Sequence, residues 1–146
     1  MEKRIDMDQL LPEAMKSMYT LSATSARSNL SHIQKGLIKI RASQINGCAF
    51  CIDMHTKEAL KAGETQQRIF LLNAWRETSL FTEEEKALLA VTEEVTLISK
   101  HGLTETTYHN ALKYFNEETL AQIIMSIVVI NAWNRIAISR HKAIPQ

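Results

Sequence analysis

Glycine and proline are scarce in this chain of 146 residues, which has only four Gly and two Pro. Turn-forming residues are therefore few, and the composition excludes collagen-like and linker-rich architectures as well as intrinsic disorder. No apolar run approaches the ~20 residues needed to cross a bilayer, and the first residues lack the apolar stretch of a secretory signal. We therefore expect a cytoplasmic protein that does not enter a membrane.

Net charge is also nearly absent, because 17 Lys and Arg residues balance 16 Asp and Glu residues to give a formal charge of +1. A balanced surface has no field that would gather polyanions, so nucleic acid binding is not expected. The chain contains no Gly-rich phosphate loop and thus nothing that indicates nucleotide binding. Its length suits one hydrophobic core, and we expect residues 1–146 to form a single domain.

Apolar residues recur with the period of a helix, and sparse cap and turn signals divide the chain into helical lengths. Short apolar runs at residues 37–41 and 127–130 could each pass for a strand, but both lie within longer windows of helical spacing. We therefore expect an all-α bundle of about six to seven helices. The first is expected to begin near residue 8, and the others to cover residues 28–44, 48–62, 65–76, 82–101, 104–115 and 116–141.

The last of these expected helices is apolar around most of its circumference. Ile123, Ile127 and Val128 belong to an inward stripe, while Met125 and Trp133 lie on other sides. A chain of this length has little material with which to surround such a helix. We therefore expect the long helix to bury part of its surface against another subunit in a homo-oligomer. The alternative is a central core helix that is surrounded by its own neighbours.

Cysteine is nearly absent too, and the two that occur, Cys48 and Cys51, are only three residues apart. Such a pair cannot join distant parts of a fold, and in a cytosolic protein it is more often redox-active or metal-binding. In a helix, positions 48, 51 and 55 fall on one face, so both sulfur atoms and the His55 imidazole are expected to point the same way. Free amides in the first turn favour a thiolate at Cys48, while His55 is one turn from Cys51.

These three side chains are compatible with three interpretations. A thiolate could attack a hydroperoxide, become a sulfenic acid and be captured by the other cysteine as a disulfide, with His55 as the base. The three groups could instead bind zinc, which would need a fourth ligand from His32, His101 or His109. They could also be two small buried thiols beside a core histidine. We favour the redox interpretation, which asks for the groups that are present and for no metal or cofactor.

The stretch over residues 37–55, with its Cys-x-x-Cys-x-x-x-His pattern, resembles the core signature of the alkylhydroperoxidase D-like proteins of the carboxymuconolactone decarboxylase superfamily. Residues 73–78 and 130–135 are also similar to that family. The resemblance implies an all-helical fold and assembly as trimers or hexamers through long helices. It also implies reduction of a hydroperoxide substrate by a thiol pair, which a thiol or dithiol reductant, a protein or a lipoyl-type group, then restores.

Carried over by position, the resemblance implies that Cys51 attacks the peroxide, Cys48 resolves the intermediate and His55 relays protons. The superfamily's other chemistry, decarboxylation of a lactone acid, needs an acid and a base but has no use for a thiol pair. A lyase of this type is therefore an alternative that the two cysteines count against. A further alternative is a non-catalytic oligomeric module whose thiols sense oxidation or hold a metal ion.

Two positions depart from the family's pattern. The family's proton relay often begins with a Glu twelve residues before the first cysteine, where this chain has Gly36, and a His often precedes the second cysteine, where this chain has Phe50. A Gly inside a helix costs about 1 kcal/mol relative to Ala, so Gly36 indicates either a close approach of another segment or sequence drift. The candidates for a replacement carboxylate are Glu93 and Glu94, and more weakly Glu58.

Overall fold

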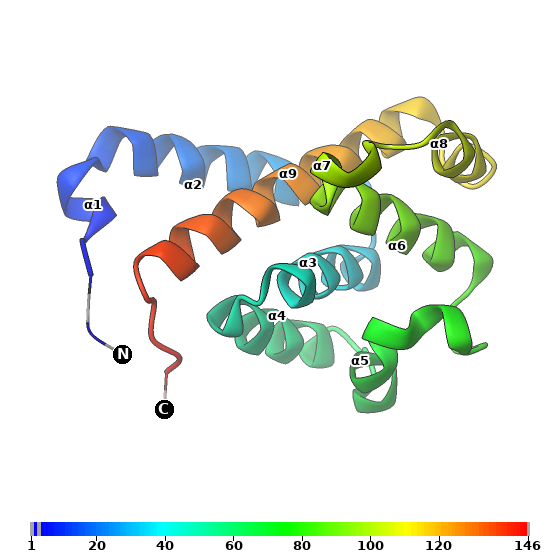
Figure 1. The fold of residues 1–146 in the computed structure, drawn as a ribbon, viewed down its shortest axis with the longest axis horizontal. Coiled ribbons are helices and arrows are strands. Elements are labelled where there is room, and N and C mark those ends of the chain that lie inside the picture. Colours follow the sequence, from blue (N-terminus) through cyan, green and yellow to red (C-terminus); the bar gives the residue numbers. More distant parts are fainter. Residues whose placement is uncertain (1, 3, 146) are drawn as a thin grey trace.

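The computed structural model describes residue 2 and residues 4–145 (Figure 1). This part of the chain forms nine α-helices and one 3₁₀-helix and contains no strand, which confirms the predicted all-α class. The α-helices and the 3₁₀-helix η1 have these bounds: α1 (Met7–Leu10), α2 (Pro12–Ala26), α3 (His32–Asn46), α4 (Ala49–Lys61), α5 (Gln66–Leu71), η1 (Leu72–Glu77), α6 (Glu83–Thr96), α7 (Ile98–His101), α8 (Glu105–Ala111) and α9 (Glu117–Ser139).

The number of helices exceeds the predicted six to seven because three of the expected helices are each divided in two. Pro12 stands at the start of α2 and holds Leu11 outside the helical region, at φ −134° and ψ 58°, so α1 and α2 separate there. The helix expected over 65–76 is α5 followed by η1, within which Ala74 departs from helical dihedral angles. The helix expected over 82–101 breaks at Leu97, between α6 and α7.

Side-chain caps begin most of the longer helices. Ser31 and Gln34 form a reciprocal capping box at α3, and Thr82 and Glu85 form the box at α6 that the sequence predicts. The Asn116 side chain accepts from the Thr119 amide at 2.8 Å and begins α9. These caps satisfy first-turn amides that have no acceptor within the helix. Those at Thr82 and Asn116 were predicted from short local patterns, whereas α3 begins at His32, four residues later than expected.

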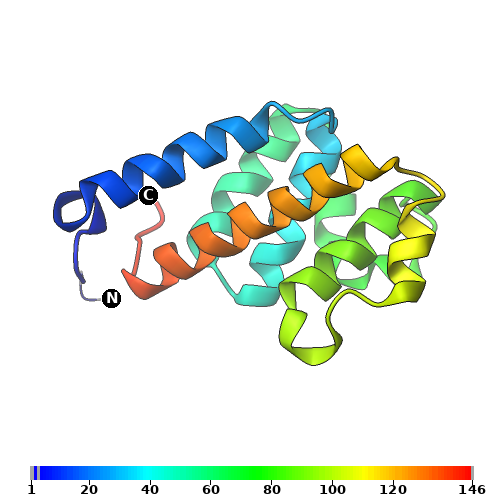
Figure 2. The same cartoon turned by 90° about the horizontal axis from the view of Figure 1, so that it is seen from above.

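The core is centred on α3, which packs against α4 on one side and against α6 and α9 on the other (Figures 1 and 2). Its buried side chains interlock with those of the surrounding helices in one apolar cluster, which includes Leu37, Ile38, Ile40, Leu72, Leu88, Leu89, Val91, Ile123 and Ile127. The helix α2 lies along α9 at the edge of the molecule, and Met15 is its only fully buried side chain. The space between this outer layer and α3 and α4 holds the candidate site.

The helix α9 combines both predicted environments. It contacts α2, α3, α4 and α6 and buries Ile123 and Ile127, as a central core helix does. However, Val128, expected on the inward stripe, is 46% exposed, and Met125 and Ile138 are exposed to a similar degree. The statement that no apolar run is long enough to cross a bilayer is too strict for α9, whose 23 residues meet that criterion by length and composition. Core helices of globular proteins can meet the same criterion, and α9 buries one face in the core while 33% of its most apolar window is buried in all.

Candidate active site

A left-handed turn between α3 and α4 positions the first cysteine. The helix α3 ends at Asn46, and Gly47 follows with φ 69° and ψ 31°, a conformation that glycine adopts without a side-chain penalty. The Cys48 amide then donates to the Ser43 carbonyl at 3.0 Å, and Cys48 becomes the N-cap residue of α4. The sequence predicted both the break at Asn46-Gly47 and the new helix immediately after it.

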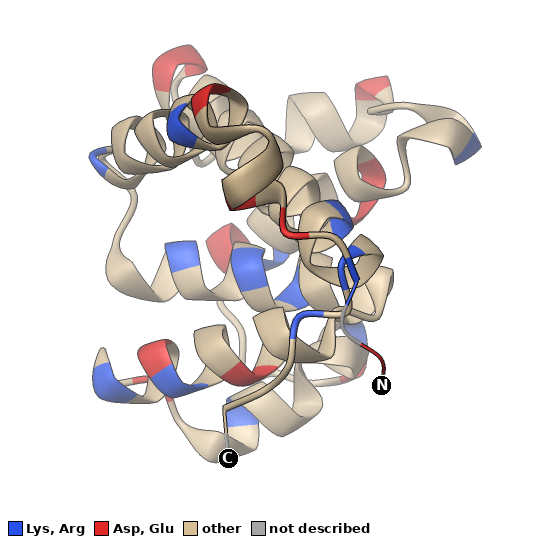
Figure 3. Ribbon diagram, turned by 90° about the vertical axis from the view of Figure 1, so that its left-hand side faces the viewer, with Lys and Arg blue, Asp and Glu red and all other residues tan. Residues whose placement is uncertain are grey.

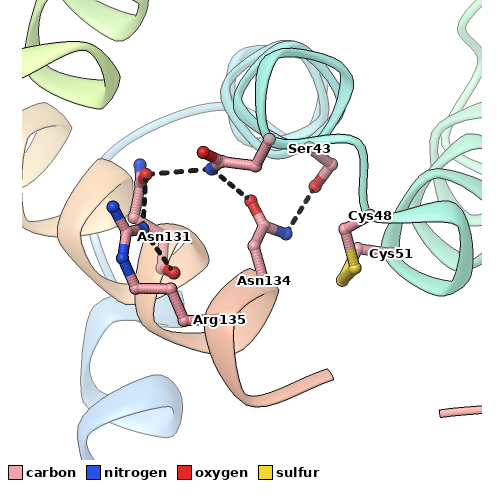
Figure 4. Close-up of a disulfide and its surroundings, with 7 residues drawn as sticks. Ser43, Cys48, Cys51, Asn131, Asn134 and Arg135 are labelled. Atoms are coloured by element: carbon pink, nitrogen blue, oxygen red, sulfur yellow. Dashed lines mark hydrogen bonds between the residues drawn. A yellow bond between two sulfur atoms is a disulfide. The ribbon is translucent and has the colours of Figure 1, made fainter. Parts of the chain in front are cut away.

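Cys48 and Cys51 are joined by a disulfide at the start of α4 (Figure 4). Their Cα atoms are 5.3 Å apart, because one turn of helix separates the N-cap from the third helical residue. Both are almost completely buried, packed with Ala137 of α9 and the partly buried Phe50. In the reduced state the unpaired amides of this first turn, together with the positive end of the helix dipole, would stabilise a thiolate.

A cavity of about 340 Å³ opens beside the disulfide, between α2, α3, α4 and α9. Cys51 and His55 both line it, whereas Cys48 is not among the described residues in its wall. The two cysteines are therefore inequivalent in the folded protein, since only Cys51 borders space that a small molecule could enter. The volume of the cavity, about 340 Å³, is at the lower end of the range found for ligand pockets.

His55 is buried on α4, and its Nδ1 atom lies 2.8 Å from Oε2 of Glu58, one turn further along the helix. Burial, which penalises the charged form, and the charge of Lys39 lower the pKa of His55, and the Glu58 carboxylate only partly opposes this. His55 is therefore neutral at neutral pH. An Nδ1–H that donates to Glu58 leaves Nε2 as the basic nitrogen.

Gly36 allows α3 and α4 to approach each other closely. Of the two explanations offered for this glycine, a close approach of another segment and sequence drift, the structure supports the first. A Cβ atom at this position would lie 3.3 Å from the Ala59 Cβ, closer than an ordinary van der Waals contact. Gly36 lines a second, smaller hollow of about 170 Å³ together with His55 and Glu58. Gly36, where the family often has a carboxylate, thus lines the same hollow as Glu58, the carboxylate that contacts His55 in this chain.

Glu93 and Glu94 are held elsewhere. Glu93 accepts hydrogen bonds from Arg41 Nε and Trp75 Nε1, both at 2.8 Å, and also pairs with Arg76. Burial opposes its ionisation, but these donors outweigh burial and lower the pKa of Glu93. Glu94 instead binds the start of α8, where it accepts from the Thr104 amide at 2.8 Å. The structure does not bring either carboxylate to the cavity that Cys51 and His55 share.

A buried polar network beside the disulfide was missed by the sequence analysis (Figure 4). Asn134 of α9 is fully buried and donates to the Ser43 hydroxyl at 3.0 Å, and its own oxygen accepts from Asn46 at 2.9 Å. Asn46 also donates to Asn131, which is in contact with Arg135. Two asparagines three residues apart in an apolar helix were the available signal. The network ties the end of α3, from which Cys48 follows, to α9.

Among residues 2 and 4–145 the structure contains no group of three or more His, Cys, Asp and Glu side chains arranged to hold a metal ion. The zinc interpretation needed His32, His101 or His109 as a fourth ligand, and these lie at the start of α3, at the end of α7 and in α8. A zinc site of that composition therefore receives no support from the geometry.

Comparison with known sequences agrees with this architecture. The carboxymuconolactone decarboxylase family matches residues 11–94, more than half of the chain. The chain is 42% identical over 139 residues to the uncharacterized protein YdfG of Bacillus subtilis, which covers 95% of each protein. It is 23% identical over 120 residues to the uncharacterized protein YnjA of Escherichia coli, covering 79% of this chain and 63% of YnjA. The chain belongs to the carboxymuconolactone decarboxylase family.

Solved structures identify the type of fold within that family. A protein of unknown function from Agrobacterium tumefaciens, suggested to be the antioxidant defence protein AhpD, has a TM-score of 0.95 at 39% identity and 99% coverage of both chains. The debrominase Bmp8 without ligand has a TM-score of 0.81 at 18% identity, covering 92% of this chain and 72% of Bmp8, and shows the fold alone. The predicted alkylhydroperoxidase D-like fold is confirmed.

Proposed function

We propose that the protein is a thiol-dependent peroxidase in which Cys48 and Cys51 alternate between two thiols and a disulfide. The observation that carries this proposal is the shared cavity wall of Cys51 and His55, with Cys48 bonded to Cys51 from behind. Family membership and the likeness to a structure suggested to be AhpD support an antioxidant enzyme. The same assignment gives Cys51 the attacking role and Cys48 the resolving role.

The first step forms a sulfur–oxygen bond. His55 Nε2 takes the proton of the Cys51 thiol, and the thiolate attacks the terminal oxygen of a hydroperoxide R–O–O–H, breaking the O–O bond. Cys51 becomes a sulfenic acid, and the leaving alkoxide takes the proton from His55 to become an alcohol. Sulfur has lost two electrons, and the peroxide has gained them.

The second step forms the disulfide seen in the structure. The Cys48 sulfur attacks the Cys51 sulfur, and the hydroxyl group of the sulfenic acid leaves with the Cys48 proton as water. A thiol or dithiol reductant, a protein or a lipoyl-type group, then reduces the disulfide and is itself oxidised to a disulfide. Glu58 orients His55 in both steps by holding its Nδ1–H.

The proposal includes association of several copies of the chain. Exposed apolar side chains on α9, including Met125 and Val128, support burial against a partner subunit, and the resemblance implies a trimer or hexamer. A location in the cytoplasm, where a thiol pair can be kept reduced, is part of the same proposal.

Mass spectrometry tests the proposal directly. The fully reduced protein is mixed with one equivalent of a hydroperoxide, treated with an alkylating reagent and weighed intact. We expect two alkylated thiols before the peroxide and none afterwards, with the mass lowered by two hydrogen atoms in an unalkylated sample. The proposal is wrong if both thiols stay alkylatable and the protein consumes no hydroperoxide with any dithiol reductant.

A further inference from the structure

The cavity beside Cys51 has largely apolar walls. Phe50 and Met54 come from α4, and Val129, Ile130, Trp133 and Ile136 come from α9. Because a water molecule occupies about 30 Å³ in the liquid, a volume of about 340 Å³ has room for about eleven non-hydrogen atoms. Such a space accommodates a short alkyl chain or a small ring rather than hydrogen peroxide alone.

Most of the charged side chains that line this apolar space are cationic. Four cationic side chains line the cavity, Lys35, Lys39, Arg140 and Lys142, against one carboxylate, Glu58. Figure 3 faces the end of the molecule that carries both termini, where Lys and Arg positions are interspersed with Asp and Glu positions on the helices and on the terminal segments beside them. The balanced charge of the whole chain therefore does not describe this site, whose lining has an excess of cations.

Two of the four cations already have partners. Arg140 pairs with Asp8 at 2.8 Å, and Lys35 donates to the carbonyl oxygens of Ala26 at 2.8 Å and Ser28 at 3.2 Å. Lys39 and Lys142 form no ion pair within residues 2 and 4–145. These two ammonium groups are thus available to an anion from outside the chain.

The two available cations lie beside different parts of the candidate site. The Lys142 ammonium is 4.2 Å from the centre of the Phe50 ring, next to the disulfide-bearing turn of α4. Lys39 lines both hollows that contain His55, and its charge acts on that imidazole. An anionic group in the cavity would therefore lie near Lys142 at the disulfide end or near Lys39 at the His55 end.

We propose that the cavity binds an organic acid with a short apolar body, so that the hydroperoxide substrate is an amphipathic carboxylate. The reaction itself rests on the proposed function, while the binding preference does not. The apolar walls take the body, and the carboxylate pairs with Lys39 or with Lys142, depending on the end of the cavity at which it lies; it has no part in the chemistry. A neutral molecule of the same size would leave the two cations without a partner, and a cation would be repelled.

The proposal is tested with the disulfide form of the protein, which needs no turnover. Calorimetry compares octanoate, octan-1-ol and octylammonium, three probes with the same chain and different charge. We expect octanoate to bind about tenfold more tightly than octanol, and octylammonium to bind least tightly. Trp133 fluorescence locates the probe, because octanoate should change the emission of the wild type but not of Trp133→Phe.

Substitutions identify the source of the preference. Lys39→Met and Lys142→Met keep an apolar stem of similar length, and the double variant should bind octanoate no more tightly than octanol. Lys57→Met is the matched control, because Lys57 is exposed on α4 and pairs with Asp53 away from the cavity, and this variant should bind as the wild type does.

Two outcomes would overturn the binding proposal. One is an octanol affinity equal to or higher than that of octanoate in the wild type, and the other is an unchanged octanoate preference in a folded double lysine variant. Failure of the peroxidase proposal looks different, since octanoate would still bind the disulfide form while the reduced protein left every hydroperoxide unconsumed.

Discussion

The Nδ1 atom of His55 and the Oε2 atom of Glu58 lie 2.8 Å apart, one helical turn from each other on α4. The contact fixes which nitrogen of the imidazole is free to act as a base. It also provides a carboxylate from α4 where the family often has one on α3, at the position that is Gly36 here. In the proposed peroxidase mechanism, Glu58 of α4 is therefore the carboxylate that orients His55.

Glu58→Gln should therefore slow the reaction of the reduced protein with a hydroperoxide by about tenfold. The amide keeps a hydrogen bond but removes the charge that raises the pKa of His55, so the acidic limb of the pH–rate profile should move to lower pH. Stopped-flow measurement of disulfide formation checks both effects. Asp53→Asn, which breaks an exposed ion pair on the same helix, is the control. Identical rates for the two variants would argue against a role for Glu58.

Substitution of each cysteine should separate the two proposed roles. Cys51→Ser should consume no hydroperoxide. Cys48→Ser should consume a single equivalent and stop with one added oxygen atom on Cys51, because nothing resolves the sulfenic acid. Intact-mass measurement after one equivalent of peroxide distinguishes the two products. If Cys51→Ser gained the oxygen atom instead, Cys48 would be the attacking residue.

The free energy of unfolding should decrease as the pH falls below about 6.5, the ordinary pKa of histidine. The folded state lowers the pKa of His55. Between the pKa of His55 in the folded protein and that in the unfolded chain, the unfolded chain binds more protons, so acidification stabilises the unfolded state relative to the folded state. Urea unfolding of the wild type and of His55→Gln at about pH 7.5 and about pH 5 measures this contribution. The wild type should lose more stability than the variant. His109→Gln, at an exposed position, should behave as the wild type does.

Asn134→Leu should destabilise the fold by about 2 to 4 kcal/mol, because it leaves the buried Ser43 hydroxyl without its partner and removes one of the two acceptors of the Asn46 amide. The exposed Asn73 provides the control, and Asn73→Ala should stay within about 0.5 kcal/mol of the wild type. Chemical denaturation with a common slope for all three proteins gives the comparison. Equal midpoints for Asn134→Leu and the wild type would show that the network contributes nothing to stability.

Glu93→Gln should lower stability by about 1 to 2 kcal/mol, because Arg41 loses a partly buried charged partner. Its reaction with hydroperoxide should match the wild type, since Glu93 does not line the cavity. Glu83→Gln, at an exposed ion pair, should change stability by less than about 0.5 kcal/mol. A rate loss as large as that of Glu58→Gln would mean that Glu93 reaches the reacting groups.

The helical class and the placing of the two cysteines followed from the sequence alone. Caps such as Thr82 with Glu85, the Gly47 turn and the three-residue interval between Cys48 and Cys51 are local patterns. Backbone geometry converts each of them directly into structure, because the rise and twist of a helix are the same wherever it packs. The short apolar runs at residues 37–41 and 127–130, which resemble strands, lie within α3 and α9, as the helical spacing of the longer windows around them predicted.

Only the tertiary structure decided which carboxylate meets His55, which cysteine borders the cavity and where Asn134 binds. From the sequence, Glu93 and Glu58 are both candidate partners of His55. The rotation of α6 in the core, however, turns Glu93 toward Arg41 and Trp75. The rotation and crossing of packed helices depend on how all their side chains interlock at once. A single helix carries its periodicity in its own sequence, whereas the neighbour that each face meets is set by the whole core.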